Sequence, residues 1–234
     1  SFTADIKVGS GAMMETIEHA RLLARNIVDI ANGAGLKTTA LITGMNQVLS
    51  HSAGNALEIR EVIEYLKGEV TTKRLDDLVK AIATQMLISG QLFKTAEEAG
   101  AAIDKAISSG ASLEKFGQMI HALGGPADFI SQYDQYLGTA PVVKDIIVQT
   151  DGFITQMDVH DIGMAIVDMG GGRRRPSDDV DPSVGLDHML GIGEHVEAGK
   201  TRLCTLHAKD KISWQTASQT ILRAVTIDNS VSCV

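Results

Sequence analysis

Hydrophobic and polar positions divide the chain into parts with different predicted secondary structure. The first part opens with a strand-like run at 2–8, followed by a glycine-containing loop, an amphipathic helix at about 14–32 and a short β-branched strand at 37–43. A strand, a helix and a second strand in this order form a βαβ unit, whose right-handed crossover makes the two strands parallel. The pattern therefore predicts a parallel sheet with helical cover at the start of the chain.

A long helical segment follows the second strand. Apolar residues recur in it at helical spacing, and Gly68, Gly90 and Gly110 stand where helices are expected to end. Thr95 and Glu98 have the spacing of a capping box, in which a hydroxyl and a carboxylate satisfy the free amides at a helix start. The predicted helices are 55–66, 74–89, 95–108, 113–122 and 127–136.

The pattern changes near Pro141, where short β-rich runs replace the long helices. The fold class that follows is α/β. Residues 1–143 are predicted to form a partial parallel-sheet α/β domain with a helical cover, and residues 144–234 a small α+β C-terminal domain. The predicted strands of this second domain are 142–150, 153–157, 184–186 and 203–207, and its predicted helices are about 160–169 and 213–225.

Composition and charge narrow the range of functions. The 234 residues carry 21 Lys and Arg against 29 Asp and Glu, a net charge of −8, which argues against a general nucleic-acid binder because phosphate binding needs a basic surface. No apolar run approaches the ~20 residues that a membrane span requires. The only cysteines, Cys204 and Cys233, are far apart, which predicts no disulfide framework and favours a reducing, cytoplasmic setting.

The glycine loop after the first strand is the first candidate for binding chemistry. Gly9 and Gly11 allow backbone N–H groups to approach an anion at the start of the following helix, where the helix dipole favours negative charge. The loop has neither the Gly-x-Gly-x-x-Gly pattern nor a Gly-Lys-Ser/Thr ending. The alternative is a tight turn after which Met13 packs in the core.

Residues 170–175, Gly-Gly-Gly-Arg-Arg-Arg, form the second candidate. Consecutive glycines predict a mobile loop, and arginine side chains suit phosphate or carboxylate groups. The alternative is a helix end followed by a solvated basic loop, which Asp178, Asp179 and Asp181 neutralise.

A third candidate combines the loop at 49–52 with Glu61. Main-chain carbonyl groups and a carboxylate are the ligands that a hard cation prefers. The alternative is that Glu61 lies on a helix surface and pairs with Lys67 or Arg60. The residues alone favour this alternative, because helix-surface carboxylates are common.

The sequence predicts no catalytic residue. None of the seven histidines has the i, i+4 spacing with an intervening glutamate that marks a helical zinc site. A Ser-His-Asp triad is recognised by geometry and cannot be assigned from residue order. Cys204 lies in an apolar–polar alternation and is expected to be packed rather than nucleophilic.

Several of these segments together resemble one enzyme family. They occur in the same order as in the pyrimidine nucleoside phosphorylases, the family that includes thymidine phosphorylase, and they span nearly the whole chain. The resemblance is to the C-terminal portion of these enzymes. The segments that carry it are Asp5–Ala12, Ala31–Gly35 with Thr38–Leu41, Met45–Glu58, and Gly163–Ala165 with Gly170–Arg173.

The resemblance implies a pentosyltransferase that carries out reversible phosphorolysis. In this reaction phosphate attacks C1′ of thymidine and releases thymine and 2-deoxyribose 1-phosphate, and catalysis depends on orientation and electrostatic stabilisation. The partners implied are a pyrimidine nucleoside and phosphate as co-substrate, within a cytoplasmic homodimer that uses no organic cofactor. Whether uridine is a second substrate stays open.

The same resemblance implies roles in substrate binding for a few residues. Met13 matches the apolar position beside the 5-substituent of the pyrimidine, where its thioether could touch the methyl group of thymine. Gly9 and Gly11 match the loop that meets the opposite wall when the cleft closes. Arg173, with the rest of 170–175, matches a loop near the cleft mouth and is expected to act as part of a lid.

A monovalent cation site is also implied by the resemblance. Leu49, Ser52 and Glu61 match positions that help to bind this ion in the family, with Ser52 in place of the more usual alanine. Because the ligand at that position is a main-chain carbonyl, the replacement is compatible with the site. The other ligands of the cation belong to the family's earlier half.

Motifs of that earlier half are absent from the 234 residues. They are the Lys-x-Ser-Thr-Gly-Gly phosphate loop, the Ser-Gly-Arg-Gly-type motif, and the Arg, Ser and Lys that hold the pyrimidine ring. Both ends of the chain also read as cut from something longer. We therefore expect a fragment that is inactive without its N-terminal half.

A non-catalytic carrier module is the second function class considered. The segment 184–209, with turns at Gly191, Gly193 and Gly199, is compatible with a small β-sandwich of the lipoyl or biotinyl type. Such a module needs a modified lysine at a hairpin tip, typically flanked by methionines. Lys209 has alanine and aspartate as neighbours and lacks that setting.

Overall fold

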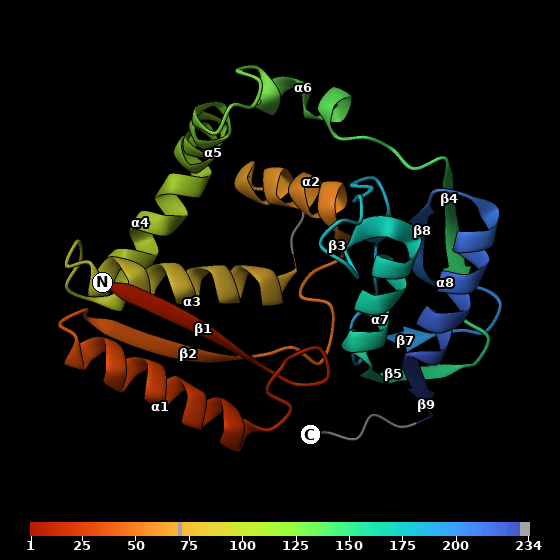
Figure 1. Cartoon of the computed structure of the whole chain (residues 1–234), viewed down its shortest axis with the longest axis horizontal. Coiled ribbons are helices and arrows are strands. Elements are labelled where there is room, and N and C mark those ends of the chain that lie inside the picture. The colour runs from red at the N-terminus through yellow and green to blue at the C-terminus, as the bar shows by residue number, and fades with distance from the viewer. Residues whose placement is uncertain (70–71, 230–234) are drawn as a thin grey trace. The chain divides into compact units, whose positions relative to one another are not determined.

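The computed structural model describes residues 1–69 and 72–229, which form two compact units (Figure 1). Unit 1 comprises residues 1–45 and 63–131, and unit 2 comprises residues 46–62 together with the described residues from 132 onward. Helices and small sheets build both units, so the α/β class predicted from the sequence is confirmed. The predicted boundary between residues 143 and 144 separates two domains of the family. A division into compact units does not test such a boundary, so it stays a prediction.

Unit 1 is built on two parallel strands joined by a helix. β1 (Phe2–Val8) and β2 (Thr38–Gly44) pair in register along their whole length, and α1 (Ile17–Gly33) makes the crossover, as the βαβ pattern predicted. Alternation along β1 turns Ala4 and Ile6 to one face, where they are buried together with two alanines of α1.

Helices cover both faces of these strands. α1 and α3 (Lys73–Ser89) each contact β1 and β2, and Figure 1 shows the strands lying between the two helices. The unit continues through α4 (Ala96–Ser108) and α5 (Ala111–Ala122), whereas α2 (Asn55–Leu66) and α6 (Phe129–Tyr136) each cross from one unit to the other along the chain.

Unit 2 contains two small antiparallel sheets and two main helices. The strand order is β3-β6-β8-β4 in the four-stranded sheet and β7-β5-β9 in the three-stranded sheet. The elements are β3 (Ala53–Gly54), β4 (Val142–Ile147), β5 (Gly152–Met157), α7 (Val159–Ile166), the π-helix η1 (Val167–Gly171), β6 (Gly185–Asp187), β7 (His195–Val196), β8 (Arg202–Ala208), α8 (Lys211–Arg223) and β9 (Val225–Asp228).

The core of unit 2 is one extended apolar cluster. Ile154, Leu203, Leu206 and Ile221 are fully buried in it, and they come from both sheets and from α8. Cys204 is buried in the same cluster, where burial, with a smaller contribution from the nearby Asp145 charge, raises the pKa of its thiol to about 12. This environment agrees with a packed cysteine rather than a nucleophile, while Cys233 lies outside the described residues.

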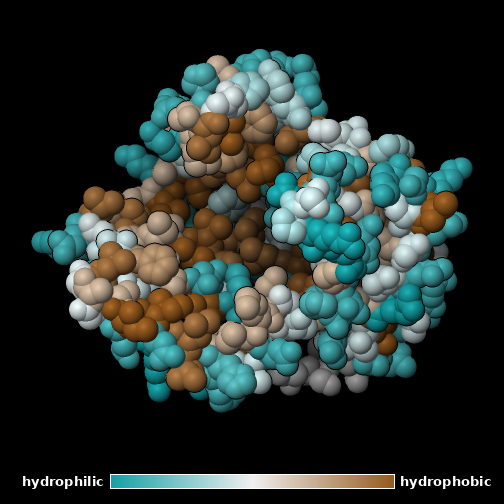
Figure 2. Space-filling model, viewed as in Figure 1, coloured by the Kyte–Doolittle hydropathy of each residue, from teal (hydrophilic) through white to brown (hydrophobic). Residues whose placement is uncertain are grey.

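Apolar side chains also reach the surface of unit 1. Figure 2 shows hydrophobic, brown side chains there, and the exposed ones include Phe2 of β1 and Leu22 and Ile30 of α1. Within the described residues, no helix combines the length and the apolar character that crossing a membrane requires.

Local capping explains why some predicted helix ends differ from the observed ones. α1 begins at Ile17 rather than near Met14, because Thr16 caps the helix by accepting a hydrogen bond from the N–H of His19. In α8 the predicted helix ran to Val225, but the helix ends at Arg223 and the following residues form β9.

The capping box predicted before α4 is only half confirmed. The Thr95 hydroxyl accepts a hydrogen bond from the N–H of Glu98, as expected. The Glu98 carboxylate, however, accepts from the N–H of Lys94 rather than from that of Thr95. Both side chains therefore still accept a hydrogen bond from a backbone N–H at the helix start, but the Glu98 carboxylate bonds one residue earlier in the chain than a capping box requires.

Candidate functional site

The glycine loop of unit 1 follows the carboxyl end of β1, at the edge where open α/β sheets bind ligands. Gly9 has a φ of +129°, a value that favours glycine, and its N–H donates to the carbonyl of Met14 at 3.1 Å. The Gly11 N–H donates to the carbonyl of Met45 at 3.0 Å, and the Met45 N–H donates to that of Val8 at 2.7 Å. Because both glycine amides are engaged within the chain, the loop offers a ligand its surface and side chains rather than these two N–H groups.

Met13 projects from this loop with 94% of its surface exposed. Its neighbour Met14 is partly buried and packs against the core of unit 1. The alternative in which Met13 packs in the core is therefore wrong, because Met14 takes that position. An exposed, flexible thioether beside the edge of the sheet is available for contact with an apolar group of a ligand.

A polar cluster lies on β1 and β2 just before this loop. Lys7 Nζ lies 2.7 Å from Asp5 Oδ2 and donates to Thr43 Oγ1 at 2.9 Å, while the Thr43 hydroxyl donates to Asp5 Oδ1. On the same face the hydroxyl groups of Thr3 and Thr39 are buried with no hydrogen-bond partner among the described residues. Parallel strands usually have apolar faces, so this polar face is a feature that the sequence analysis missed.

Glu61, on α2 of unit 2, reaches the loop at 49–52. It is only 8% exposed, and its Oε1 accepts a hydrogen bond from the backbone N–H of His51 at 3.2 Å. The alternative of a helix-surface carboxylate is therefore wrong, and Arg60, one of the two partners considered for it beside Lys67, pairs with Asp134 instead. A buried carboxylate beside a loop with main-chain carbonyl groups, including those of Leu49 and Ser52, is a donor set that fits a hard cation.

A second carboxylate of α2, that of Glu58, reaches Gly54 of β3, the strand that directly follows this loop. Its Oε1 accepts a hydrogen bond from the N–H of Gly54 at 2.9 Å. Burial raises the pKa of the Glu58 carboxyl, the Gly54 N–H lowers it, and the negative charge of Glu61 raises it. The sequence analysis missed Glu58, although its position three residues before Glu61 on the predicted helix was a signal that both share one face.

The loop at 49–52 is attached to the sheet of unit 2. Ser52 Oγ donates to Asp187 Oδ1 at 3.3 Å, and the N–H of Met189 donates to the carbonyl of His51 at 3.0 Å. Directly after the loop, β3 pairs with β6 and becomes the edge strand of the sheet. Asp187, which no sequence pattern pointed to, therefore helps to hold the candidate cation loop in place.

Arg173 lies on the loop that follows η1. Its Nε donates to the carbonyl of Asp178 at 3.0 Å, and the backbone N–H groups of Arg174 and Arg175 donate to the Asp178 carboxylate at 3.1 and 2.8 Å. The Arg174 guanidinium pairs with Asp168 of η1, an acid that the sequence analysis did not include. All three arginines are exposed, and the mobility expected of this loop stays a prediction.

These residues form separate groups along the chain. Gly9, Gly11 and Met13 belong to unit 1. In unit 2, Asn55, the first residue of α2, donates through Nδ2 to the carbonyl of Gly171 at 2.8 Å. This hydrogen bond joins the segment that follows the candidate cation loop (residues 49–52) to the arginine loop (residues 170–175).

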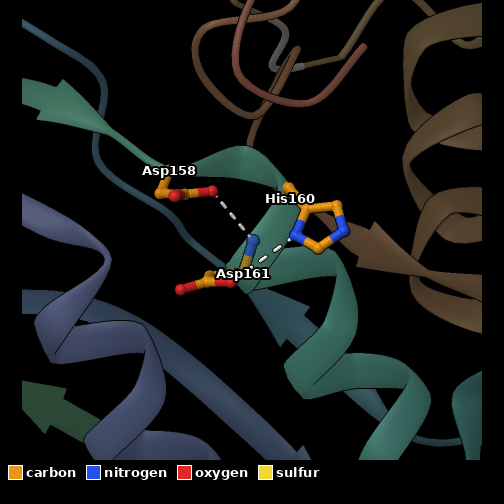
Figure 3. Close-up of side chains that lie close together, drawn as sticks. All are labelled: Asp158, His160 and Asp161. Carbon is orange, nitrogen blue, oxygen red and sulfur yellow. Dashed lines mark hydrogen bonds and ion pairs between the residues drawn. The ribbon is translucent and has the colours of Figure 1, made fainter. Parts of the chain in front are cut away.

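A cluster of Asp158, His160 and Asp161 lies at the start of α7 (Figure 3). Asp158 caps this helix by accepting a hydrogen bond from the N–H of Asp161 at 3.0 Å, and His160 Nδ1 lies 3.5 Å from Asp161 Oδ1. All three side chains are exposed. Helix capping accounts for this arrangement, so it is not assigned as a metal site.

Lys209 is placed in the connection between β8 and α8. A carrier module needs its modified lysine at the tip of a hairpin between two strands. Because a strand precedes Lys209 and a helix follows it, the carrier-module alternative finds no support in the structure.

Two family models match the chain. One describes the pyrimidine nucleoside phosphorylase C-terminal domain and matches residues 153–228, which include the arginine loop. The other describes the a/b domain of a glycosyl transferase family and matches residues 1–113, which include the glycine loop and the loop with Glu61. The two matches follow one another along the sequence and together span most of it.

Proposed function

Because this chain belongs to the pyrimidine nucleoside phosphorylase family, we propose that it forms part of a thymidine phosphorylase. The proposed reaction is a reversible pentosyl transfer in which a phosphate oxygen bonds to C1′ of thymidine while the bond from C1′ to the base nitrogen breaks. The products are thymine and 2-deoxyribose 1-phosphate. Positive charge develops on the sugar and negative charge on the departing base, so positioning and electrostatic stabilisation are the main requirements.

The position of Met13 is the observation that carries the choice of thymidine. Its side chain is exposed on the loop after β1. Within that loop the Gly9 N–H donates to the carbonyl of Met14, and the Gly11 N–H ties the loop to Met45, the residue after β2. An apolar thioether at this edge suits the 5-methyl group that distinguishes thymine from uracil. Gly9 and Gly11 then belong to the loop that meets the opposite wall when the cleft closes.

We further propose that the chain alone is inactive. The phosphate loop and the residues that hold the pyrimidine in this family do not occur in the 234 residues. These groups should supply most of the transition-state stabilisation, since catalysis of this kind rests on oriented charges. The chain would then act with a segment that carries them, in the cytoplasmic homodimer that the family resemblance implies, with Arg173 on a loop that closes over the cleft.

Leu49, Ser52 and Glu61 are proposed to hold a monovalent cation in that enzyme. The burial of Glu61 and its hydrogen bond to the loop at His51 support this assignment. A bound cation supplies a fixed positive charge that offsets the buried carboxylate. In the complete enzyme, potassium should raise the melting temperature of the wild type more than that of Glu61→Gln. Glu69→Gln, which alters an exposed acid later in the sequence, is the control.

Thymine release with and without the missing motifs tests the proposed function. The purified chain is assayed with thymidine and phosphate, first alone and then co-expressed with the N-terminal half of a thymidine phosphorylase. We expect no thymine from the chain alone and measurable release from the pair. Thymine release by a chain preparation free of complete enzyme would overturn the proposed inactivity. A folded pair that releases no base from thymidine, deoxyuridine or uridine would overturn the enzyme assignment itself.

A further inference from the structure

An open cavity of about 340 Å³ lies in unit 2 between α8 and the continuous pair α7–η1. None of its lining residues belongs to the glycine loop, the arginine loop or the candidate cation loop. α8 and α7 run antiparallel, since the N–H of Asp158 before α7 donates to the carbonyl of Ala224 after α8 at 2.7 Å. The start of α8 therefore faces the end of α7 and η1, and the cavity is a groove along two helices.

The two ends of this groove differ in chemistry. Asp168, Lys209 and Asp210 line the end near the start of α8. Further along, α8 presents the hydroxyl groups of Thr216 and Thr220, which are four residues apart and share one helix face. The buried residues Ala165, Met169 and Ala217 supply an apolar floor.

A π-helical turn shapes one wall of the groove. η1 covers Val167–Gly171. Near its end Gly170 leaves the helical conformation, with a φ of +103° that lies in the region that favours glycine. This turn carries both Asp168 and Met169, which line the groove. π-helical turns are rare, and they occur frequently at functional sites.

Charge is compensated unevenly around the groove. Asp168 Oδ1 accepts hydrogen bonds from Arg174, and Asp210 Oδ1 accepts from the N–H and the hydroxyl of Ser213 at 2.7 and 2.9 Å. The Ser213 N–H is also the main reason that the pKa of Asp210 is lowered. Lys209 is exposed and makes no ion pair with any described residue, although its charge helps to lower the pKa of the neighbouring Asp210. Its ammonium group is the cationic side chain that lines this end of the groove, where a ligand can reach it.

We propose that this groove binds a pentose-sized sugar phosphate, with the phosphate on Lys209 and the sugar along α8. An ammonium group is a strong point-charge partner for a phosphate. Sugar hydroxyls can donate to the second oxygen of Asp168 and exchange hydrogen bonds with the Thr216 hydroxyl, while the apolar face of the ring lies on Met169 and Ala217. The Thr220 hydroxyl donates its own proton to the carbonyl of Thr216 at 3.3 Å, so its oxygen can accept from the sugar. The proposal does not rest on the phosphorolysis reaction, because it uses a different set of residues.

Alanine methyl groups allow a direct test with the chain itself. Ala165 and Ala217 line the groove, so their methyl signals report occupancy when the ¹³C-methyl-labelled protein is titrated with ribose 5-phosphate and followed by NMR. Ribose and inorganic phosphate serve as separate probes for the two halves of the ligand. We expect ribose 5-phosphate to shift both methyl signals at lower concentration than either half.

Matched lysine variants assign the binding to the groove. Lys209→Gln should weaken ribose 5-phosphate binding by about tenfold or more, because a charge-assisted hydrogen bond is lost. Lys211→Gln removes the same charge from a lysine two residues further along, whose side chain does not line the groove. This variant should bind ribose 5-phosphate like the wild type. Thr216→Val keeps the side-chain shape and removes one hydroxyl, and it should weaken ribose 5-phosphate more than inorganic phosphate.

Four results would overturn the proposal. They are unshifted Ala165 and Ala217 methyl signals, equal binding by the two lysine variants, inorganic phosphate binding as tightly as ribose 5-phosphate, and Thr216→Val weakening both probes alike. The other alanine methyl signals show in each variant that the fold is retained.

Discussion

Met13 and Met14 are adjacent in sequence but lie in opposite environments, and the sequence could not distinguish them. Both are apolar residues after a tight turn, and the choice between packing and exposure depends on how the loop is tied to Met45 beyond β2. The same holds for Glu61, whose burial follows from its contact with a loop ten residues earlier. At this scale the sequence could propose candidates, whereas tertiary contacts decide between their alternative roles.

Replacing Met13 separates a contact with the base from a role in packing. In the complete enzyme, Met13→Ala should lower the ratio of kcat/KM for thymidine to kcat/KM for deoxyuridine. The expected loss corresponds to about 1–3 kcal/mol of transition-state binding, the usual range for one apolar contact. Its melting temperature should change little, because the side chain is exposed. Met14→Ala is the matched control, expected to lower the melting temperature and keep the substrate ratio. An unchanged ratio for Met13→Ala would remove Met13 from the base pocket.

His207, on β8, is expected to make stability depend on pH. Burial lowers the pKa of this half-buried imidazole; the Asp187 carboxylate opposes this effect, and the charges of His188 and Arg60 add to it. The unfolded chain therefore takes up a proton at a higher pH than the folded chain does, so stability is lost as the pH falls below the unfolded value of about 6.5.

Urea unfolding at several pH values measures this dependence. Between about pH 7.5 and 5.5 the free energy of unfolding of the wild type should fall, and that of His207→Gln should fall less. Equal slopes for the wild type and His207→Gln would show that His207 does not contribute.

At the scale of elements, local pattern was sufficient where an element has its own periodicity. β1 and α2 have the predicted bounds, and the βαβ unit is parallel as expected. The two-residue strands β3 and β7 were missed because such short segments have no hydrophobic alternation. They are strands only through pairing with β6 and β5, which lie far away in the sequence.

The pairing of β3 with β6 depends on two facing glycines. Gly54 and Gly185 are register partners, and a Cβ on Gly185, whose φ is +155°, would lie 2.4 Å from the carbonyl oxygen of Ala53. Gly185→Ala should therefore destabilise unit 2 by about 2 kcal/mol or more, since both a clash and backbone strain are introduced.

Gly163→Ala provides a control of the same chemistry. Gly163 lies inside α7, and a Cβ there meets no atom within 4 Å. This substitution should stabilise the chain by about 0.5–1 kcal/mol, because alanine favours a helix more than glycine does. Urea unfolding of both variants gives the comparison, and a Gly185→Ala protein as stable as the wild type would contradict the close approach of the two strands.

On the scale of the whole molecule, the sequence could not show how the chain is divided into units. Residues 46–62 precede most of unit 1 in sequence but belong to unit 2, through long-range bonds such as that from the Ile192 N–H to Gln47 Oε1 at 2.9 Å. Such contacts join side chains and backbone groups far apart in the chain, and no local pattern encodes them. Composition and the order of elements were sufficient to predict the α/β class, but they could not show that residues 46–62 belong to unit 2.

The two units should differ in stability because their cores differ in size. In the described part of unit 1, the buried cluster under the strands consists of Ala4, Ile6, Ala20 and Ala24, three of which are alanines. The sheet there has only two strands, so each has an unpaired edge within the described residues. In unit 2, β8 lies between β6 and β4 and adds Leu203 and Leu206 to a much larger cluster. Burial of more apolar surface gives unit 2 the larger driving force for folding.

Hydrogen exchange of the backbone amides measures this difference. Amides of β1 and β2 should exchange at least about tenfold faster than those of β8, a difference of about 1.4 kcal/mol in the free energy of opening. Leu206→Ala removes apolar volume from unit 2 and should accelerate exchange in β8 while leaving β1 unchanged. If β1 and β8 instead exchange at the same rate and both respond to Leu206→Ala, the two units unfold as one, and the small core of unit 1 is stabilised by contacts with the rest of the chain.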